Sequence, residues 1–344
     1  MKVNLEGQLK EQRMKVDFNS YDFSIKEIVS MIDEGIINIS PEYQRQFRWE
    51  NDRQSALIES LFLGIPIPNL FMATNLDNTW ELIDGVQRIS TIIRFIGDED
   101  LRKKLNIEGE LKLDGLSKLE AFNGLKFKEL PMSIQLNFRL ATLKVTTLSD
   151  KSDKKVRFDL FERLNKGGVI LSDQEIRGCV YRGEFNDFIR KMSQNQDFLN
   201  CIKLTKAQDK DGTKEELVLR FFAFLNKYME FNHSVVDFLN DYMEEASRIF
   251  NYNDGEMIFK KVFKELRNAL PRGIVKNRNV TPLNLYEGIT VGAALAIKET
   301  GEINTSNIDE LINSEELKKY VTGSTNSKVN VRGRIELCKS KFEV

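Results

Sequence analysis

The sequence predicts an α+β fold with short strands and helices in the first half of the chain and helices alone in the second. Before residue 150, short apolar runs such as 70–73 and 80–83 alternate with segments whose apolar residues recur at helical spacing. From about residue 180 onward, helical spacing dominates. We therefore expect a polar arm at 1–20 that frays or adds to a sheet edge, a first domain at 21–180 and an α-helical domain at 181–344.

Caps, periodicity and turns predict the elements of the first domain. Ser24 and Glu27 form a capping box for a helix that Gly35 ends. Asn51 is expected to cap a second helix, with Gln54 at the reciprocal position. The other expected elements are a strand at 36–39, an extended connector at 65–68, an antiparallel hairpin at 70–83, a helix that follows it, small helices and turns at 97–130, a helix at 132–137, a strand at 140–147 and a helix at 152–164.

The second half of the chain shows long amphipathic segments separated by Pro and Gly. The expected helices are 215–228, 235–250, 256–269 and 283–298.

Composition excludes several classes of protein. The 51 basic and 52 acidic residues nearly cancel, so no global field draws the chain to nucleic acid or membrane. Three distant cysteines favour a reducing cytoplasm, and no apolar run is long enough to cross a membrane. With His233 as the single histidine, zinc sites and His-based nucleases are not expected. Any chemistry must use carboxylates, Arg, Tyr, amides and a hard cation such as Mg²⁺.

The most informative stretch is the turn between the strand at 80–83 and the helix after it. Asp84, Gln87 and Arg88 bring hydrogen-bonding groups to a place where backbone N–H groups and the positive end of a helix dipole also meet. This combination indicates an anion-binding site. The alternative is an ordinary turn in which Asp84 caps the helix and Arg88 forms a solvated salt bridge.

Two other segments combine polar and aromatic residues. Residues 41–49 (PEYQRQFRW) lack a clear period and favour a loop that contacts a ligand, or else a surface loop anchored by its aromatics. Residues 161–177 place a helix end, the pair Gly167-Gly168 and a new capped helix close together, which also fits a simple connection between helices.

Four motifs in this order resemble the family of the GmrSD restriction endonuclease N-terminal domain, the GmrS-like part. They are Pro41 to Arg45 followed by Trp49, the run from Leu57 to Pro68, the turn Asp84-Gly85-Val86-Gln87-Arg88, which is similar to the family signature Asp-Gly-Gln-Gln-Arg, and Phe161 to Asn165 with Gly167, Gly168 and Gln174 to Arg177. The resemblance covers residues 20–185 and is loose beyond them.

The resemblance implies a ParB- and sulfiredoxin-like fold, a small mixed sheet with helices whose signature turn binds nucleotide phosphates. Relatives hydrolyse NTPs and act in defence against phage with modified DNA, coupled to an HNH-type nuclease. By matching position, the catalytic residues would be Asp84, Gln87 and Arg88, and the nucleotide-binding residues would be Tyr43, Gln44, Arg45, Gly85 and Asn165.

The resemblance and the chemistry agree on the roles of these groups. Arg88 and Arg45 can fork onto phosphate oxygens, and Asp84 can hold a water or a Mg²⁺ ion. Gln87 would orient the attacking water and Tyr43 would contact the base. The expected ligands are an NTP and Mg²⁺, with no protein-bound metal cluster.

Two departures from the family pattern define the alternatives. Val86 replaces the first Gln of the signature, which favours a non-catalytic module that senses DNA or a partner as the competing hypothesis. The single histidine predicts that an HNH nuclease would be a separate chain. DNA contacts are assigned to the basic loop with Arg272, Lys276 and Arg278, whose simpler interpretation is a solvated face. A nuclease acting alone would need a carboxylate cluster that no Asp/Glu spacing indicates.

Overall fold

The computed structural model describes residues 17–39, 49–75, 77–149, 158–160, 162–163, 172–276 and 279–343, together with Leu5, Gly7 and Leu9. The chain divides into two compact units, an N-terminal unit of Met1–Ile170 and a C-terminal unit of Leu171–Val344.

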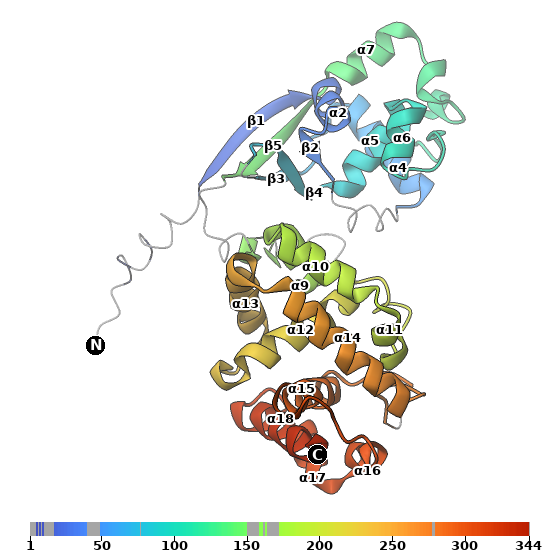
Figure 1. Cartoon of the computed structure of the whole chain (residues 1–344). Coiled ribbons are helices and arrows are strands. Elements are labelled where there is room, and N and C mark those ends of the chain that lie inside the picture. Colours follow the sequence, from blue (N-terminus) through green and yellow to red (C-terminus); the bar gives the residue numbers. More distant parts are fainter. Residues whose placement is uncertain are drawn as a thin grey trace. The chain divides into compact units, whose positions relative to one another are not determined.

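The N-terminal unit combines strands and helices. Its elements are β1 (Phe18–Ser24), α2 (Ile25–Asp33), β2 (Ile37–Asn38), α4 (Asn51–Phe62), β3 (Leu70–Thr74), β4 (Trp80–Asp84), α5 (Val86–Ile96), α6 (Glu99–Lys104), η1 (Glu120–Phe122), η2 (Phe127–Glu129), α7 (Met132–Leu140) and β5 (Thr142–Leu148). Figure 1 shows α4, α5 and α6 gathered next to the sheet.

Within the described residues, five strands form one mixed sheet in the order β1-β5-β3-β4-β2. β1 pairs antiparallel with β5, and β3 pairs antiparallel with β4 as the predicted hairpin. β3 and β5 run parallel, as do β2 and β4. The predicted small mixed sheet with helices is therefore present, and it places the end of β4 between β3 and the short β2.

β1 was not predicted as a strand, although its first residues fall in the arm that was expected to fray or to add to a sheet edge. Phe18 to Asp22 are exposed, so the segment lacks the alternation of buried and exposed residues that marks a strand in a sequence. Backbone pairing with β5 defines it instead.

Apolar side chains from sheet and helices form the core of this unit. Leu70, Met72, Leu82 and Val145 are fully buried on the strands. The irregular stretch between α6 and α7 joins the core through Phe127, whose ring centroid lies 5.2 Å from that of Phe95. The β4–α5 turn thus rests on a packed base.

The described part of the C-terminal unit is helical, as predicted. Its α-helices are α9 (Asp173–Val180), α10 (Glu184–Ser193), α11 (Gln196–Cys201), α12 (Thr213–Lys227), α13 (Val235–Ile249), α14 (Tyr252–Ala269), α15 (Leu283–Thr300), α16 (Ile308–Asn313), α17 (Glu315–Val321) and α18 (Lys328–Phe342), and a short turn of 3₁₀-helix, η3 (Tyr228–Glu230), follows α12.

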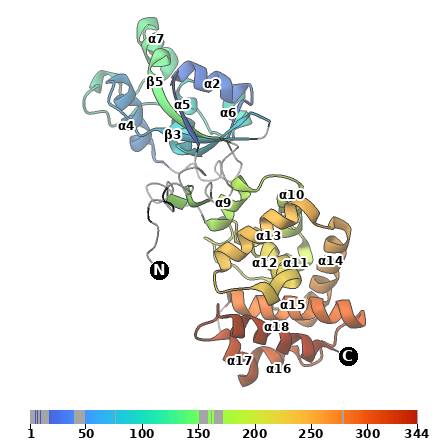
Figure 2. The same cartoon turned by 90° about the vertical axis from the view of Figure 1, so that its left-hand side faces the viewer.

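The most extensive helix contact among the described residues of this unit joins α15 and α18, which lie side by side in Figures 1 and 2. A Cβ on Gly292 would lie 2.6 Å from the Cβ of Cys338, so only glycine permits this approach. No helix of the described residues is both long enough and apolar enough to cross a membrane.

Candidate functional site

The turn between β4 and α5 requires glycine for two reasons. Gly85 has φ +107°, in the left-handed region, and a Cβ there would lie 2.3 Å from Leu70 Cδ2. Gly85 is also the N-cap of α5, where it has no side chain to cap the helix. The N–H groups of Val86, Gln87 and Arg88 form the first turn of α5, where a helix has no intrahelical acceptors for them. The sequence prediction of a strand, an Asp-Gly break and a helix start is confirmed here.

Arg88 is buried and connects three parts of this turn. Its Nη2 donates to Asp84 Oδ2 at 2.6 Å. Its Nη1 donates to the carbonyl oxygen of Pro68 and, at 3.2 Å, to that of Asn69. Arg88 therefore ties the proline-containing connector to the end of β4, and it keeps the Asp84 carboxylate in place.

Asp84 is the more accessible partner of this ion pair. Its side chain is 37% exposed, against 10% for Arg88. Its Oδ2 is held by Arg88, and no hydrogen bond from a described residue to Oδ1 is found. The sequence alternative of Arg88 in a solvated salt bridge is wrong, because the guanidinium is buried, and Asp84 does not cap α5.

Gln87 holds the chain that follows the 41–45 motif. Its Oε1 accepts from the Trp49 N–H at 3.2 Å, and the Trp49 carbonyl accepts from Gln54 Nε2 at 2.6 Å. Gln54 Oε1 in turn accepts from Arg94 Nη1 at 3.0 Å. The polar groups of α4 and α5 are thus one network with Trp49 at its centre.

This network corrects the prediction for the start of α4. Glu50, not Asn51, is the N-cap, and it makes no side-chain capping bond. Asn51 instead donates to the Lys112 carbonyl and accepts from Arg94, while Gln54 serves the Trp49 network. The two side chains that were expected to cap the helix form hydrogen bonds with residues distant in the sequence.

Sequence reasoning missed two charged residues on β4 and α5, the elements that flank this turn. Glu81 lies in the middle of β4 and is 1% exposed. Arg94 donates to the backbone carbonyl of Glu108 and to the side-chain amide oxygens of Asn51 and Gln54. Burial lowers the pKa of its guanidinium. A carboxylate inside an apolar strand was the available signal for Glu81, whereas nothing local distinguished Arg94.

Val86 occupies the position of the first Gln of the family signature. Its side chain is buried, with 8% exposure. This position therefore supplies apolar packing under the helix start in place of a hydrogen-bonding group.

Other predicted nucleotide-binding residues cannot be placed. Tyr43, Gln44, Arg45 and Asn165 lie outside the described residues. Their roles remain predictions.

The Gln174 to Arg177 motif belongs to α9 of the C-terminal unit. Arg177 is 1% exposed. Its Nε donates to Asn240 Oδ1 at 2.8 Å, and its Nη1 donates to Glu216 Oε2 at 3.1 Å and Gln174 Oε1 at 3.2 Å. This fourth motif thus anchors α9 to α12 and α13.

The predicted DNA-binding loop is only partly described. Arg272 is exposed and Lys276 is half-buried, while Arg278 lies outside the described residues. The loop is anchored because the Ile274 N–H donates to the Cys201 carbonyl at 2.7 Å. Of its basic side chains, Arg272 lies at the surface of the C-terminal unit.

The basic residues of α18 have partners within the C-terminal unit. Arg334 is fully buried and pairs with Glu287. Lys339 pairs with Glu299 at 2.6 Å, and Lys341 pairs with Glu316. This arrangement favours a structural role over a nucleic-acid site. Among the described residues, no group of three or more His, Cys, Asp or Glu side chains could hold a metal ion.

The fold and the turn define a class of protein, namely an α+β domain with a glycine turn at a strand–helix junction, followed in the sequence by a helical unit. Residues 25–182 match the family model described as GmrSD restriction endonuclease, N-terminal domain, which confirms the predicted family over that range. The match ends just after α9.

The solved structure of a Pnob8-like ParB-N domain shows a weak likeness, at 14% identity over 95% of this chain and 99% of that chain with a TM-score of 0.23. A comparison with curated proteins finds no match.

Proposed function

We propose that this chain binds a nucleoside triphosphate at the β4–α5 turn and hydrolyses it with Mg²⁺ as part of a restriction-type defence system. The observation that carries the proposal is the start of α5, where the first helical turn follows Gly85 directly and the carboxylate of Asp84, one residue before it, is accessible. The match to a restriction endonuclease family supports the biological setting.

The helix start would hold the phosphates. The N–H groups of Val86 to Arg88 and the helix dipole favour an anion at this point. The positive φ of Gly85 lets the chain pass directly from β4 into the first turn of α5, which brings Asp84 and these N–H groups together. Arg88 Nη2 lies 3.4 Å from the position that a Cβ on Gly85 would take. The guanidinium therefore adds positive charge next to the turn while it keeps its hydrogen bonds to Asp84, Pro68 and Asn69.

Asp84 fits the role of a Mg²⁺ ligand. One of its oxygens is oriented by Arg88, and the side chain is accessible enough for the other to reach an ion or an ordered water. Mg²⁺ commonly binds through one or two carboxylates, waters and substrate phosphates. When bound, the ion would neutralise charge on the phosphates, which phosphoryl transfer requires.

The remaining predicted groups would complete the site. Gln87 would orient water, while its Oε1 holds Trp49. Tyr43, Gln44, Arg45 and Asn165 would contact the nucleotide, as their motif positions predict. Nuclease activity would come from an HNH-type domain outside these 344 residues, because His233 is the single histidine among them.

Incubation of the purified chain with each NTP and Mg²⁺ tests the proposal. We expect phosphate release, an NTP-dependent rise in melting temperature, and a loss of turnover by about a hundredfold in Asp84→Asn. Asp100→Asn is the matched control, because Asp100 is an exposed carboxylate on α6 of the same unit. If the wild type shows no phosphate release and no thermal shift, nucleotide binding and hydrolysis are refuted.

A binding-only module is the second candidate, and buried Val86 favours it. It predicts that NTP raises the melting temperature without phosphate release. Val86→Gln, compared with Val86→Leu, would then gain turnover if the missing amide is the cause. Turnover by the wild type would exclude this candidate.

DNA binding is proposed for the loop of Arg272, Lys276 and Arg278. Affinity for duplex DNA should fall steeply with salt, and Arg272→Ala should reduce the slope by about one. Lys264→Ala is the control, because Lys264 is exposed on the separate helix α14. Unchanged binding in Arg272→Ala and Lys276→Ala would exclude the loop.

A further inference from the structure

A second candidate site lies inside the C-terminal unit. A cavity of about 300 Å³ opens between α12, α13, the start of α14 and the end of α15. This volume is at the lower end of the range of small-molecule sites. Its walls belong to one compact unit, so its shape does not depend on the nucleotide site.

The floor of the cavity is aromatic and rigidly packed. Phe222 and Tyr242 are 1% and 5% exposed, and the ring centroids of Phe222 and Phe250 lie 5.2 Å apart. Gly255 leaves space for Phe250, because a Cβ there would lie 2.5 Å from the Phe250 ring. At the edge, Ile249 is 73% exposed, which is unusual for so large an apolar side chain.

Two charged side chains that line the cavity are not in ion pairs. Among the described residues, no carboxylate lies within 4.0 Å of the Lys298 ammonium, and no cation lies within 4.0 Å of Asp254. Lys298 is exposed as a residue, yet desolvation lowers the pKa of its ammonium, with partial compensation by Asp254. Asp254 accepts one hydrogen bond, from Asn251 Nδ2 at 2.7 Å.

The other charges at the rim cancel each other. Lys227 pairs with Glu245 at 3.1 Å and with Glu230 at 3.2 Å. A ligand would gain little from this cluster, whereas one cation and one carboxylate remain available close to the apolar floor.

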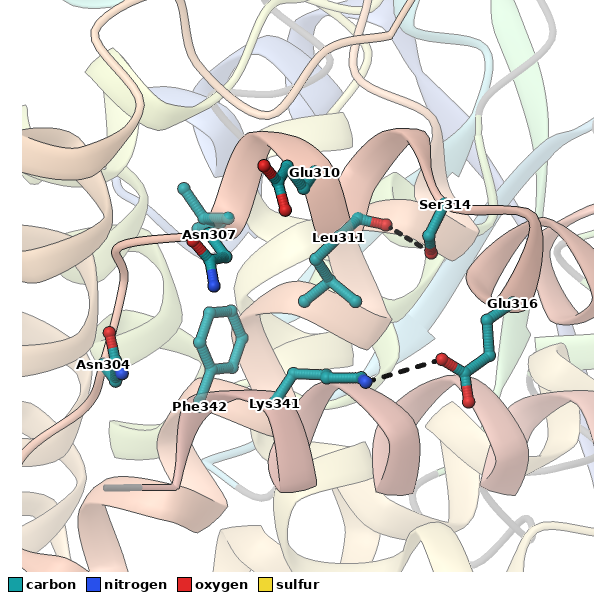
Figure 3. A pocket seen from close by; sticks show the side chains of 9 residues that line it. Asn304, Asn307, Glu310, Leu311, Ser314, Glu316, Lys341 and Phe342 are labelled. Carbon is teal, nitrogen blue, oxygen red and sulfur yellow. Dashed lines mark hydrogen bonds and ion pairs between the residues drawn. The ribbon is translucent and has the colours of Figure 1, made fainter.

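A second cavity provides a contrast. The cavity of about 230 Å³ in Figure 3 lies beside Phe342, and its ammonium group, on Lys341, already pairs with Glu316 at 3.6 Å. Phe342 is the single aromatic residue among the described residues that line it, and its cation is already paired.

We propose that the α12–α15 cavity binds a free hydrophobic α-amino acid, with its side chain on the aromatic floor, its carboxylate at Lys298 and its ammonium group at Asp254. A small zwitterion matches the two opposite charges, and an apolar side chain matches the floor and Ile249. This site is independent of the proposed nucleotide function.

Titration of the full chain, labelled at its methyl groups, with L-phenylalanine tests the site by NMR. We expect saturable shifts at Leu225, Ile249 and Ile258, and none at Ile134 of the N-terminal unit. Phenylpropionate and phenylethylamine, which each lack one charge, should bind roughly fivefold more weakly. Absence of saturable shifts at the three methyl positions would overturn the proposal.

Two variants assign the charges. Lys298→Met should weaken L-phenylalanine and phenylpropionate by roughly fivefold and leave phenylethylamine unchanged, and Asp254→Asn should show the reverse pattern. Lys264→Met is the matched control, since Lys264 is exposed on α14 outside the cavity. Circular dichroism melting verifies that each variant is folded. Equal affinity of wild type and Lys298→Met for L-phenylalanine would overturn the assignment.

Discussion

Two regions of this protein bury arginines in different ways. In the N-terminal unit, Arg88 pairs with a single carboxylate, Asp84, that remains 37% exposed. In the C-terminal unit, a continuous series of ion pairs joins Arg177, Glu216, Arg220, Glu287 and Arg334 across α9, α12, α15 and α18.

The difference lies in access. Glu287 is 2% exposed and both of its oxygens are used, by Arg220 and by Arg334. Asp84 instead combines an accessible carboxylate with the N–H groups of a helix start. Buried charge therefore marks stability in the C-terminal unit. In the N-terminal unit it marks a candidate binding site, because the Asp84 carboxylate stays accessible beside a helix start.

The largest expected effect tests the structural network. Glu287→Gln removes the charge between two buried guanidinium groups, so the free energy of unfolding should fall by about 3–5 kcal/mol. Urea denaturation of the C-terminal unit measures this. Glu299→Gln, at an exposed pair with Lys339, should cost less than about 1 kcal/mol. Equal effects of the two changes would remove the distinction between buried and exposed pairs.

Arg88→Ala should have the next largest effect. It leaves the Pro68 and Asn69 carbonyls without their donor and costs about 2 kcal/mol. Loss of NTP-dependent thermal shift should accompany it. Arg139→Ala is the control, because among the described residues Arg139 makes a cation–π contact, with its guanidinium carbon 5.3 Å from the centroid of the Phe127 ring, and no ion pair. A variant as stable as the wild type would contradict the structural role of Arg88.

Gly85→Ala sharpens the comparison at the site itself. Its positive φ and the clash with Leu70 together should cost about 2 kcal/mol, whereas Gly109→Ala has φ +62° and no neighbour within 4 Å, so it should cost about 1 kcal/mol. Urea denaturation of both variants gives the difference. Identical losses would show that the close contact with Leu70 is easily relieved.

The smallest expected effect is a loss of stability at acid pH that depends on Glu216. The pKa of Glu216 is lowered from its ordinary 4.5, because attraction by Arg220 and Arg177 outweighs its desolvation. A lowered folded-state pKa stabilises the fold above the unfolded value, and this contribution is lost as pH falls through the folded value. Urea midpoints between about pH 6 and pH 3 should therefore decline, and less so in Glu216→Gln. A decline of equal size in that variant would assign acid sensitivity to other groups.

Local patterns predicted much of this fold. The capping boxes at Ser24 and Ser172 are present, and the β3–β4 hairpin lies where the sequence placed it. These features depend on residues three to five positions apart. β1 escaped prediction because its pairing with β5 is with residues more than a hundred positions away. The prediction that Asn51 caps α4 was wrong, because its side chain bonds instead to Lys112 and Arg94, which are distant in the sequence.

The candidate site divides in the same way. Asp84, Gly85, Gln87 and Arg88 were identified from their spacing and from family resemblance. The roles of Gln54 and Arg94 emerged from the packing of α4 on α5. Periodicity could not have indicated these roles, since Arg94 bonds to Asn51 and Gln54, which lie 43 and 40 positions before it.

The sequence by itself determined the secondary structure of most segments, the family of residues 25–182 and the position of the glycine turn, because each depends on local conformational preferences and short motifs. Only the tertiary structure decided what each arginine does. The carbonyl acceptors of Arg88 lie 19 and 20 residues before it, and Asn240 lies 63 residues after Arg177. Which charges are satisfied and which stay available depends on those distant partners, and packing alone brings them together.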